Sequence, residues 1–95
     1  MKNRDKKDIE AALLAKGFQS RVTDHTYFIY HSTAGHKTPV KTKTSLSNKP
    51  KTIGGDLLHA MAQQCKLTND QFLLLVDCPL TREQYENLLH DRGLI

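Results

Sequence analysis

The stretch "TDHTYFIYHSTAGHKTPVKTKT", residues 23–44, decides the fold that we predict for this chain. It is rich in β-branched and aromatic residues and poor in strong helix formers, which favours strands. The small residues "STAG" at 32–35 are typical of a turn, so segments 25–32 and 36–44 are predicted to form a hairpin. The preceding "FQSRV" at 18–22 adds a third strand, joined to the hairpin by a short link near Asp24.

Helices are predicted on both sides of these strands. Apolar residues recur at helical spacing over 6–16, and Gly17 stands where a helix commonly ends in the left-handed conformation. A polar loop at 45–51, interrupted by Pro50, separates the last strand from a second amphipathic helix at 53–66. The apolar face of that second helix is expected to be part of the core.

Two further helices are predicted from their capping signals. "TNDQ" at 68–71 and "TREQ" at 81–84 each place Thr at the N-cap and Gln three residues later, so that side chains satisfy the first backbone amides. Helices are therefore expected at about 69–77 and 82–90, with a break at Cys78-Pro79. The predicted order is α-β-β-β-α-α-α, an α+β fold with a three-stranded antiparallel sheet packed against helices.

Length and composition fit one small domain over residues 1–95. No apolar run approaches the roughly 20 residues that cross a bilayer. The charged start "MKNRDKKDIE" lacks the apolar stretch of a secretory signal, so we expect a cytoplasmic protein with no membrane partner. Cys65 and Cys78 form no close-spaced metal or redox motif and are expected to be reduced thiols.

Basic side chains are concentrated in the middle of the chain. The formal net charge is +4, yet residues 25–55 hold five lysines and no Asp or Glu. These lysines are Lys37, Lys41, Lys43, Lys49 and Lys51. Such a segment suits a polyanion, most simply nucleic acid, because lysine contacts with phosphates release counterions. A solvated lysine-rich loop is the alternative explanation of the same composition.

Side-chain alternation along the second strand separates two sets of residues. One face holds Thr26, Phe28 and Tyr30, and the other holds His25, Tyr27, Ile29 and His31. With Phe28 and Tyr30 packed under the helices, His25 and His31 lie on the open face, roughly 20 Å apart at strand rise. Asp24 precedes His25, but regular strand geometry points its carboxyl away from the imidazole.

Several short motifs, in order, resemble the HicA family of bacterial type II toxins. They are "GF" at 17–18, Arg21, "DHTYF" at 24–28, Val40, and the Gly-led helix "IGGDLLHAMAQQCKL" at 53–67. The resemblance covers residues 9–67, about two thirds of the chain. It divides the domain into a family-like core over 1–67 and a C-terminal helical extension over 68–95.

The resemblance implies a double-stranded-RNA-binding-domain-like α-β-β-β-α core. It also implies a ribonuclease that cleaves messenger RNA independently of the ribosome, with no cofactor and with the family's catalytic histidine at His25. The implied partners are messenger RNA and a HicB-like antitoxin protein that covers the active site.

The chain departs from the family pattern in three places. Thr23-Asp24 stands where the family usually has Gly-Ser or Gly-Thr before the histidine. The third strand continues from Val40 as Lys-Thr-Lys, where the family often has proline and then a histidine. Residues 68–95 extend beyond the family core. The first departure bears on the geometry around His25, and the second removes an auxiliary histidine.

The chemistry of His25 fits metal-independent RNA cleavage. A base must remove the proton of a 2′-hydroxyl, and histidine, with an unperturbed pKa of about 6.5, offers a neutral base near pH 7. The anionic transition state also needs cations nearby. Candidate phosphate-binding residues are Arg21, Lys37, Lys41 and Lys43. Tyr27 either stacks a splayed base or packs on the sheet.

His25 is preferred over the other histidines as the catalytic group. Those are His31, His36, His59 and His90. A leaving-group acid is not evident, and His36 is a weak candidate beside water. No group has the spacing of a zinc site, so we predict no metal.

Two other functions compete with the nuclease. The same fold could serve as a non-catalytic RNA-binding module, which would depend strongly on salt. Alternatively, the extension at 68–95 could be a protein-interaction or DNA-binding module built on its helices. Its acidic balance argues against DNA, and its apolar residues indicate either packing or an interface. They are Phe72, Leu74, Leu75 and Val76.

Overall fold

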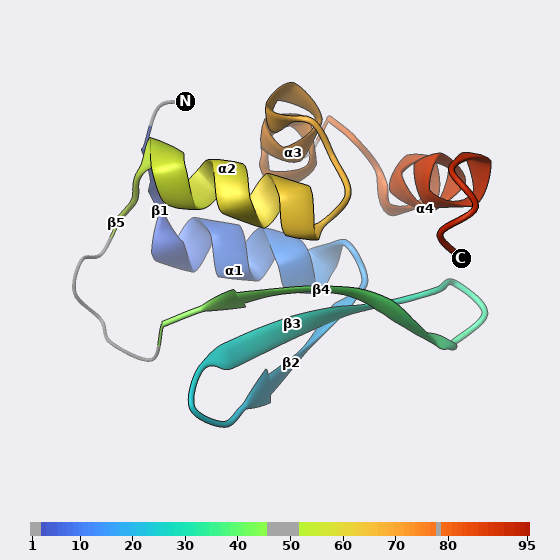
Figure 1. Cartoon of the computed structure of the whole chain (residues 1–95), viewed down its shortest axis with the longest axis horizontal. Coiled ribbons are helices and arrows are strands. Elements are labelled where there is room, and N and C mark those ends of the chain that lie inside the picture. Colours follow the sequence, from blue (N-terminus) through green and yellow to red (C-terminus); the bar gives the residue numbers. More distant parts are fainter. Residues whose placement is uncertain (1–2, 46–51, 78) are drawn as a thin grey trace.

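The computed structural model describes residues 3–45, 52–77 and 79–95, and Figure 1 shows the chain. The predicted loop residues 46–51, with Lys49 and Lys51, and Cys78 at the predicted break lie outside the described residues. In chain order the elements are β1 (Arg4–Asp5), α1 (Lys6–Ala15), β2 (Phe18–Val22), β3 (Thr26–His31), β4 (Lys37–Thr44), β5 (Thr52–Ile53), α2 (Gly55–Gln64), α3 (Asn69–Val76) and α4 (Arg82–Asp91).

The predicted three-stranded antiparallel sheet is confirmed, with strand order β2-β3-β4. Phe18 pairs with Tyr30 across β2 and β3, and Thr26 pairs with Thr44 across β3 and β4. A shift in register between Ile29 and His31 interrupts the second ladder near the hairpin turn. The sheet is therefore a meander, as short connections between antiparallel strands require.

Helices α1 and α2 cover one face of this sheet, α3 lies on the far side of these two helices, and α4 lies near the hairpin end (Figure 1). Helix α1 contacts β2, α2 contacts β4, and α3 contacts both of these helices. The strand side chains that face the helices, including Phe28, Tyr30 and Val40, are almost fully buried. The predicted alternation is thus confirmed: one face of the sheet forms the core and the other faces outward.

The C-terminal extension is part of that core. Its buried side chains are Phe72, Leu75 and Val76 from α3 and Tyr85 and Leu89 from α4. Of the apolar residues that indicated either packing or an interface, only Leu74 is exposed. Both predicted capping boxes are present, at the starts of α3 and α4. The extension therefore enlarges the core rather than presenting its apolar face to solvent.

The core also contains a cysteine, and a glycine in the left-handed conformation follows the first helix. Cys65 is a free, buried cysteine, and burial raises the pKa of its thiol to about 12. Gly17 has φ of +101° just after α1, the left-handed conformation that was predicted there. A Cβ at Gly17 would also clash with the Arg82 guanidinium, so a side chain here would be strained by the positive φ and would displace Arg82. None of the helices among the described residues has the length and apolar character to cross a membrane.

Some element boundaries were predicted wrongly. The pair β1–β5, in which Arg4 lies opposite Ile53, was not expected. Strands of two residues are too short to carry a periodic signal. Because Ile53 belongs to β5, α2 begins at Gly55 rather than at 53. Similarly, β3 begins at Thr26, which leaves His25 in the preceding turn.

Helix α4 is tied to the β3–β4 hairpin by charged side chains. The Glu86 carboxylate accepts hydrogen bonds from the Tyr30 hydroxyl at 2.8 Å and from the Thr33 backbone amide and hydroxyl at 2.7 and 2.8 Å. From the same helix, Arg82 donates to the carbonyls of His31 and Ser32. These bonds fix the hairpin turn relative to the core.

Glu86 gives a prediction about acid stability. Burial raises its pKa, but the hydrogen bonds from Tyr30 and Thr33 outweigh burial and hold the pKa below the ordinary value of 4.5. A carboxylate with a lowered pKa in the folded state stabilises the fold above the unfolded-state pKa, and this contribution is lost as the pH falls. Glu86→Ala is expected to cost about 3 kcal/mol at pH 7. Glu86→Gln is expected to cost about 1 kcal/mol, because Gln keeps one acceptor oxygen for Tyr30 and the Thr33 amide but loses the charge and the second acceptor.

Urea unfolding at several pH values measures this effect. The wild type should lose stability relative to Glu86→Gln as the pH falls below about 4.5, because only the wild type must protonate this carboxylate. Glu83→Gln, an exposed change on the same helix, should stay within about 0.5 kcal/mol of the wild type. Parallel pH curves for the wild type and Glu86→Gln would show that Glu86 makes no such contribution.

Candidate functional site

The open face of the sheet brings three predicted residues into one row. Arg21 on β2 lies opposite Tyr27 on β3, and Tyr27 lies opposite Lys43 on β4. Cross-strand partners on one face have Cβ atoms about 5 Å apart. Lys41 is two residues from Lys43 on the same face, and its Nζ lies over the Tyr27 ring, 6.0 Å from the centroid. Three cations, Arg21, Lys41 and Lys43, therefore lie around one aromatic ring, and we call these residues with Tyr27 the cationic row.

A hollow of about 320 Å³ lies beside this row and is lined by Tyr27, Lys41, Thr42, Lys43 and Gln64. Gln64 comes from α2, and its side-chain oxygen accepts a hydrogen bond of 2.6 Å from the Thr42 hydroxyl. We did not predict a role for Gln64. The only signal for it in the sequence is its place on the polar face of the predicted helix.

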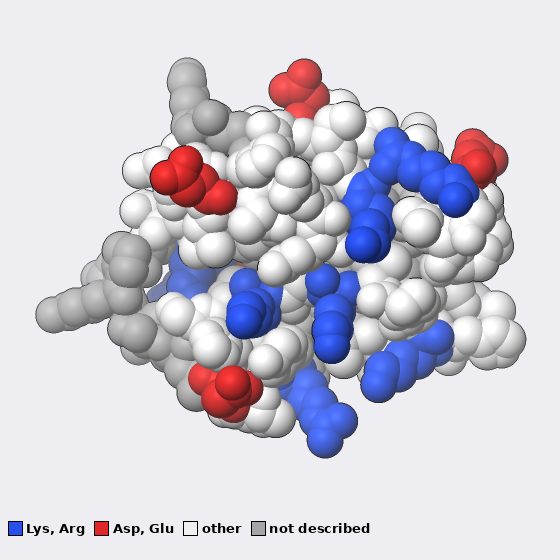
Figure 2. Space-filling model, viewed as in Figure 1, with Lys and Arg blue, Asp and Glu red and all other residues white. Residues whose placement is uncertain are grey.

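The charge in this region is mostly positive. Figure 2 shows several Lys and Arg side chains over the part of the view where Figure 1 places the strands, with further ones at the upper right, while the Asp and Glu side chains are scattered singly. One acidic residue, Asp24, lies close to the row, and its carboxylate accepts a hydrogen bond from the Tyr27 hydroxyl. The face therefore combines a cationic surface with one carboxylate at its edge.

His25 lies at that edge, in the turn between β2 and β3. The turn is closed by a hydrogen bond of 2.9 Å from the Thr23 amide to the His25 carbonyl. The His25 ring meets the Tyr27 ring edge-on, with 6.3 Å between centroids. His25 is thus next to the cationic row, although it is not itself on a strand.

The expected orientation of Asp24 was wrong. A regular strand would point the carboxyl away from His25, but both residues lie in the turn, which brings Asp24 Oδ2 within 3.3 Å of His25 Nδ1. The pair is within ion-pair distance but falls outside hydrogen-bond geometry. Nδ1 is also shielded from solvent, and it has no hydrogen bond among the described residues. Catalytic hydrogen bonds are often long before substrate binds.

Asp24 is itself held by two hydroxyls. Thr23 Oγ1 donates to Asp24 Oδ1 at 2.9 Å, and the Tyr27 hydroxyl donates to the same oxygen at 3.3 Å. The bond from Thr23, and after it the contact with His25, hold the pKa of Asp24 below its usual value. Burial and the Asp24 charge raise the pKa of Tyr27. The carboxylate is therefore ionised, and the phenol neutral, at pH 7.

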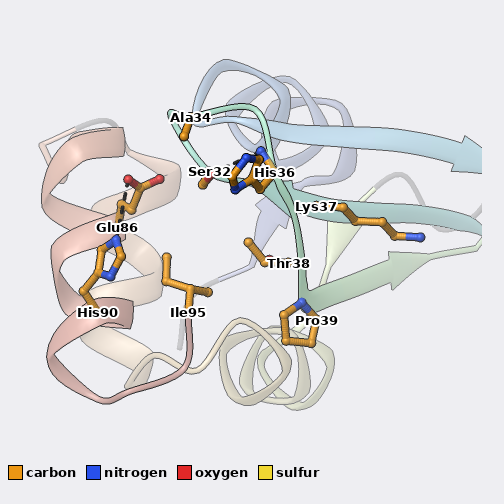
Figure 3. Close-up of a pocket in the computed structure, with 9 residues that line it drawn as sticks. All are labelled: Ser32, Ala34, His36, Lys37, Thr38, Pro39, Glu86, His90 and Ile95. Carbon is orange, nitrogen blue, oxygen red and sulfur yellow. Dashed lines mark hydrogen bonds and ion pairs between the residues drawn. The ribbon is translucent and has the colours of Figure 1, made fainter.

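Lys37 and His36 lie at the other end of the sheet. Lys37 pairs with His31, whereas Lys43 pairs with Tyr27, and six residues of strand separate the two lysines by about 20 Å. Figure 3 shows Lys37 and His36 beside a second hollow of about 320 Å³, between the hairpin and α4, with Lys37 extending away from Glu86 and His90. The structure thus brings Arg21, Lys41 and Lys43 near His25 but not Lys37 or His36.

The polar groups of this second hollow stabilise the fold. The Glu86 carboxylate already accepts hydrogen bonds from Tyr30 and Thr33 of the hairpin, and His90 Nε2 lies 3.9 Å from that carboxylate one turn along α4. Residues 3–45, 52–77 and 79–95 contain no group of three or more His, Cys, Asp or Glu side chains placed to hold a metal ion.

Comparisons of the chain with known protein families, with curated proteins and with solved structures found no match.

Proposed function

We propose that this protein is an RNA endonuclease that needs no metal ion and uses His25 as its general base. One observation carries the proposal. A half-exposed imidazole is paired with a carboxylate on one side and adjoins a face with three cations and an aromatic ring on the other. A base beside cations is what phosphodiester cleavage by a 2′-hydroxyl requires.

The reaction uses the chain's own residues. The neutral His25 imidazole removes the proton of a 2′-hydroxyl, and O2′ then bonds to the adjacent phosphorus. The bond from phosphorus to O5′ breaks, and the departing oxygen takes a proton from water. The products are a 2′,3′-cyclic phosphate and a 5′-hydroxyl. A positioned base contributes about 10²–10⁴-fold to such a step.

The cationic row supplies binding and charge stabilisation. Arg21 suits bidentate contact with a phosphate, whereas Lys41 and Lys43 act as point charges. Lys41 already lies over one face of Tyr27. An unpaired base can stack on the surface of the Tyr27 ring that Lys41 does not cover, which favours single-stranded segments of RNA. Together these groups bind the substrate through its backbone and one base.

The resemblance to HicA toxins supports a biological role. We propose that the protein is the toxin of a type II toxin–antitoxin pair, that its substrate is messenger RNA in the cytoplasm, and that a HicB-like antitoxin covers the open face of the sheet. The order helix, three antiparallel strands, helix agrees with the core that the resemblance implies. An acidic surface on the antitoxin would complement the cationic row.

Purified protein and a labelled RNA test the proposal directly. We expect cleavage in the presence of EDTA, with products that end in 2′,3′-cyclic phosphate. An otherwise identical RNA with 2′-deoxy sugars should resist cleavage, because it lacks the nucleophile. Products with 3′-hydroxyl ends, or cleavage of the 2′-deoxy substrate, would contradict the mechanism.

The second candidate function is RNA binding without cleavage. The cation–aromatic contact between Lys41 and Tyr27 favours it, since this contact serves binding and needs no base. Tight, salt-dependent binding to RNA with no cleavage between pH 5 and pH 9 would support this function and exclude the nuclease.

A further inference from the structure

We propose that Asp24 is a positioning residue: it keeps the proton of the neutral His25 imidazole on Nδ1, so that Nε2 is the atom that accepts the 2′-hydroxyl proton. The inference rests on the proposed nuclease function and deepens it. It also gives a role to Asp24, which stands directly before His25 where HicA toxins usually have Ser or Thr.

The two nitrogens of the ring have different surroundings. Nδ1 is shielded from solvent, and its neighbour is Asp24 Oδ2 at 3.3 Å. The side chain as a whole is 39% exposed although Nδ1 is shielded, so its exposure lies on the other atoms, and Nε2 is the other ring nitrogen. A neutral imidazole carries its proton on one nitrogen and offers a lone pair on the other. Only Nε2 is therefore placed to meet a substrate.

The carboxylate is fixed so that one oxygen is reserved for His25. Thr23 and Tyr27 both donate hydroxyl hydrogens to Oδ1, which leaves Oδ2 facing Nδ1. An ionised carboxylate accepts hydrogen bonds and donates none, so a hydrogen bond that closes across this 3.3 Å contact when RNA binds requires the proton on Nδ1. The lowered pKa of Asp24 keeps it ionised throughout the neutral range.

Asp24 also offsets the charges around the ring. The other titratable groups near His25 are Tyr27, which meets the imidazole edge-on, and the cations beside Tyr27, namely Arg21, Lys41 and Lys43. When Nε2 accepts a proton the ring becomes positive, and these cations oppose that charge. The carboxylate next to Nδ1 favours it. Positioning and charge stabilisation thus act in the same direction.

Asp24→Asn is the informative variant, because the two hydroxyls favour one orientation of the new amide. Thr23 and Tyr27 both donate to Oδ1, and they keep these hydrogen bonds when the amide oxygen takes the place of Oδ1. The NH₂ group then faces Nδ1 and donates to it, which forces the ring proton onto Nε2. We expect Asp24→Asn to lower kcat for RNA cleavage by about 10-fold or more, with a smaller effect on KM.

Asp24→Ala is expected to be milder than Asp24→Asn. Alanine removes the carboxylate without placing a donor against Nδ1, so part of the imidazole keeps the active tautomer. If Asp24 only stabilised the turn, Asp24→Asn would lower kcat less than Asp24→Ala, since Asn preserves the shape of Asp and its preference for turns. Asp91→Asn, at the exposed C-terminal end of α4, makes the same change of charge far from the turn and should leave kcat unchanged.

Imidazole ¹⁵N NMR at pH 8 gives a readout that does not depend on RNA, with His25 assigned by the loss of its signals in His25→Ala. We expect Nδ1–H in the wild type and Nε2–H in Asp24→Asn, with amide spectra unchanged outside the turn. The same tautomer in both proteins, or Asn milder than Ala, would overturn the positioning role. If His25→Ala cleaved RNA normally, the proposed function would fail instead, whichever tautomer was observed.

Discussion

Replacing His25 with alanine is expected to slow RNA cleavage by about 10²–10⁴-fold, the usual contribution of a positioned general base. The loss should appear in kcat rather than in RNA affinity, because Arg21, Lys41 and Lys43 are left in place. In cells, induction of the variant should no longer arrest growth. Gel-based cleavage of a labelled RNA, with binding measured in parallel, separates the two effects.

His59→Ala is the matched control. His59 is an exposed histidine on α2 whose Nδ1 lies 2.8 Å from the Asn69 side chain, and it is not part of the row or of the β2–β3 turn. Its removal should leave both cleavage and binding unchanged. Equal cleavage by the wild type and His25→Ala would show that His25 is not the base, and reduced binding without reduced kcat would assign it to RNA contact.

The faces of the sheet were predictable because strand alternation is a strict geometric rule. Once Phe28 and Tyr30 are assigned to the core, Tyr27 must lie on the opposite face, and the antiparallel partner strands bring cations beside it. Their burial and the register agree with this expectation. Alternation alone did not separate Lys41 and Lys43, which lie near Tyr27, from Lys37, because that depends on the strand register.

The Asp24–His25 contact was not predictable from the same rule. Alternation holds only within regular strands, and the chain leaves the strand geometry between Val22 and Thr26. In a turn of this length, side chains adjacent in sequence can point the same way. The signal that was available is chemical: Thr23 and Tyr27 flank Asp24 with hydroxyls that can donate hydrogen bonds to its carboxylate.

The contribution of Gln64 and the short β1–β5 pair depended on tertiary contacts. Gln64 is brought to β4 by the packing of α2 on the sheet, and the sequence of α2 does not specify which polar residue faces that strand. Arg4 and Ile53 meet because α1 and α2 begin at the same end of the molecule (Figure 1). Neither contact has a local pattern that could reveal it.

Tyr85→Ala is expected to destabilise the fold by about 4 kcal/mol, because Tyr85 joins the C-terminal helix to the centre of the core. Its side chain is fully buried and its ring packs against Phe18 and Tyr30, with centroids 5.8 and 5.0 Å away. Its hydroxyl donates a hydrogen bond of 2.8 Å to the Cys65 carbonyl. A small domain has only about 5–15 kcal/mol in total, so this one change removes much of it.

Thermal and urea unfolding measure the loss, which corresponds to a fall in Tm of roughly 15–30 °C for a domain of this size. Tyr85→Phe keeps the ring contacts and leaves the Cys65 carbonyl without its donor, so it should cost only about 1–2 kcal/mol. Asn87→Ala, an exposed change on the same helix, should cost less than about 0.5 kcal/mol. If Tyr85→Ala unfolded as late as Asn87→Ala, α4 would be an appendage. A large loss would show that α4 is part of the core on which the sheet, and with it the β2–β3 turn, depends.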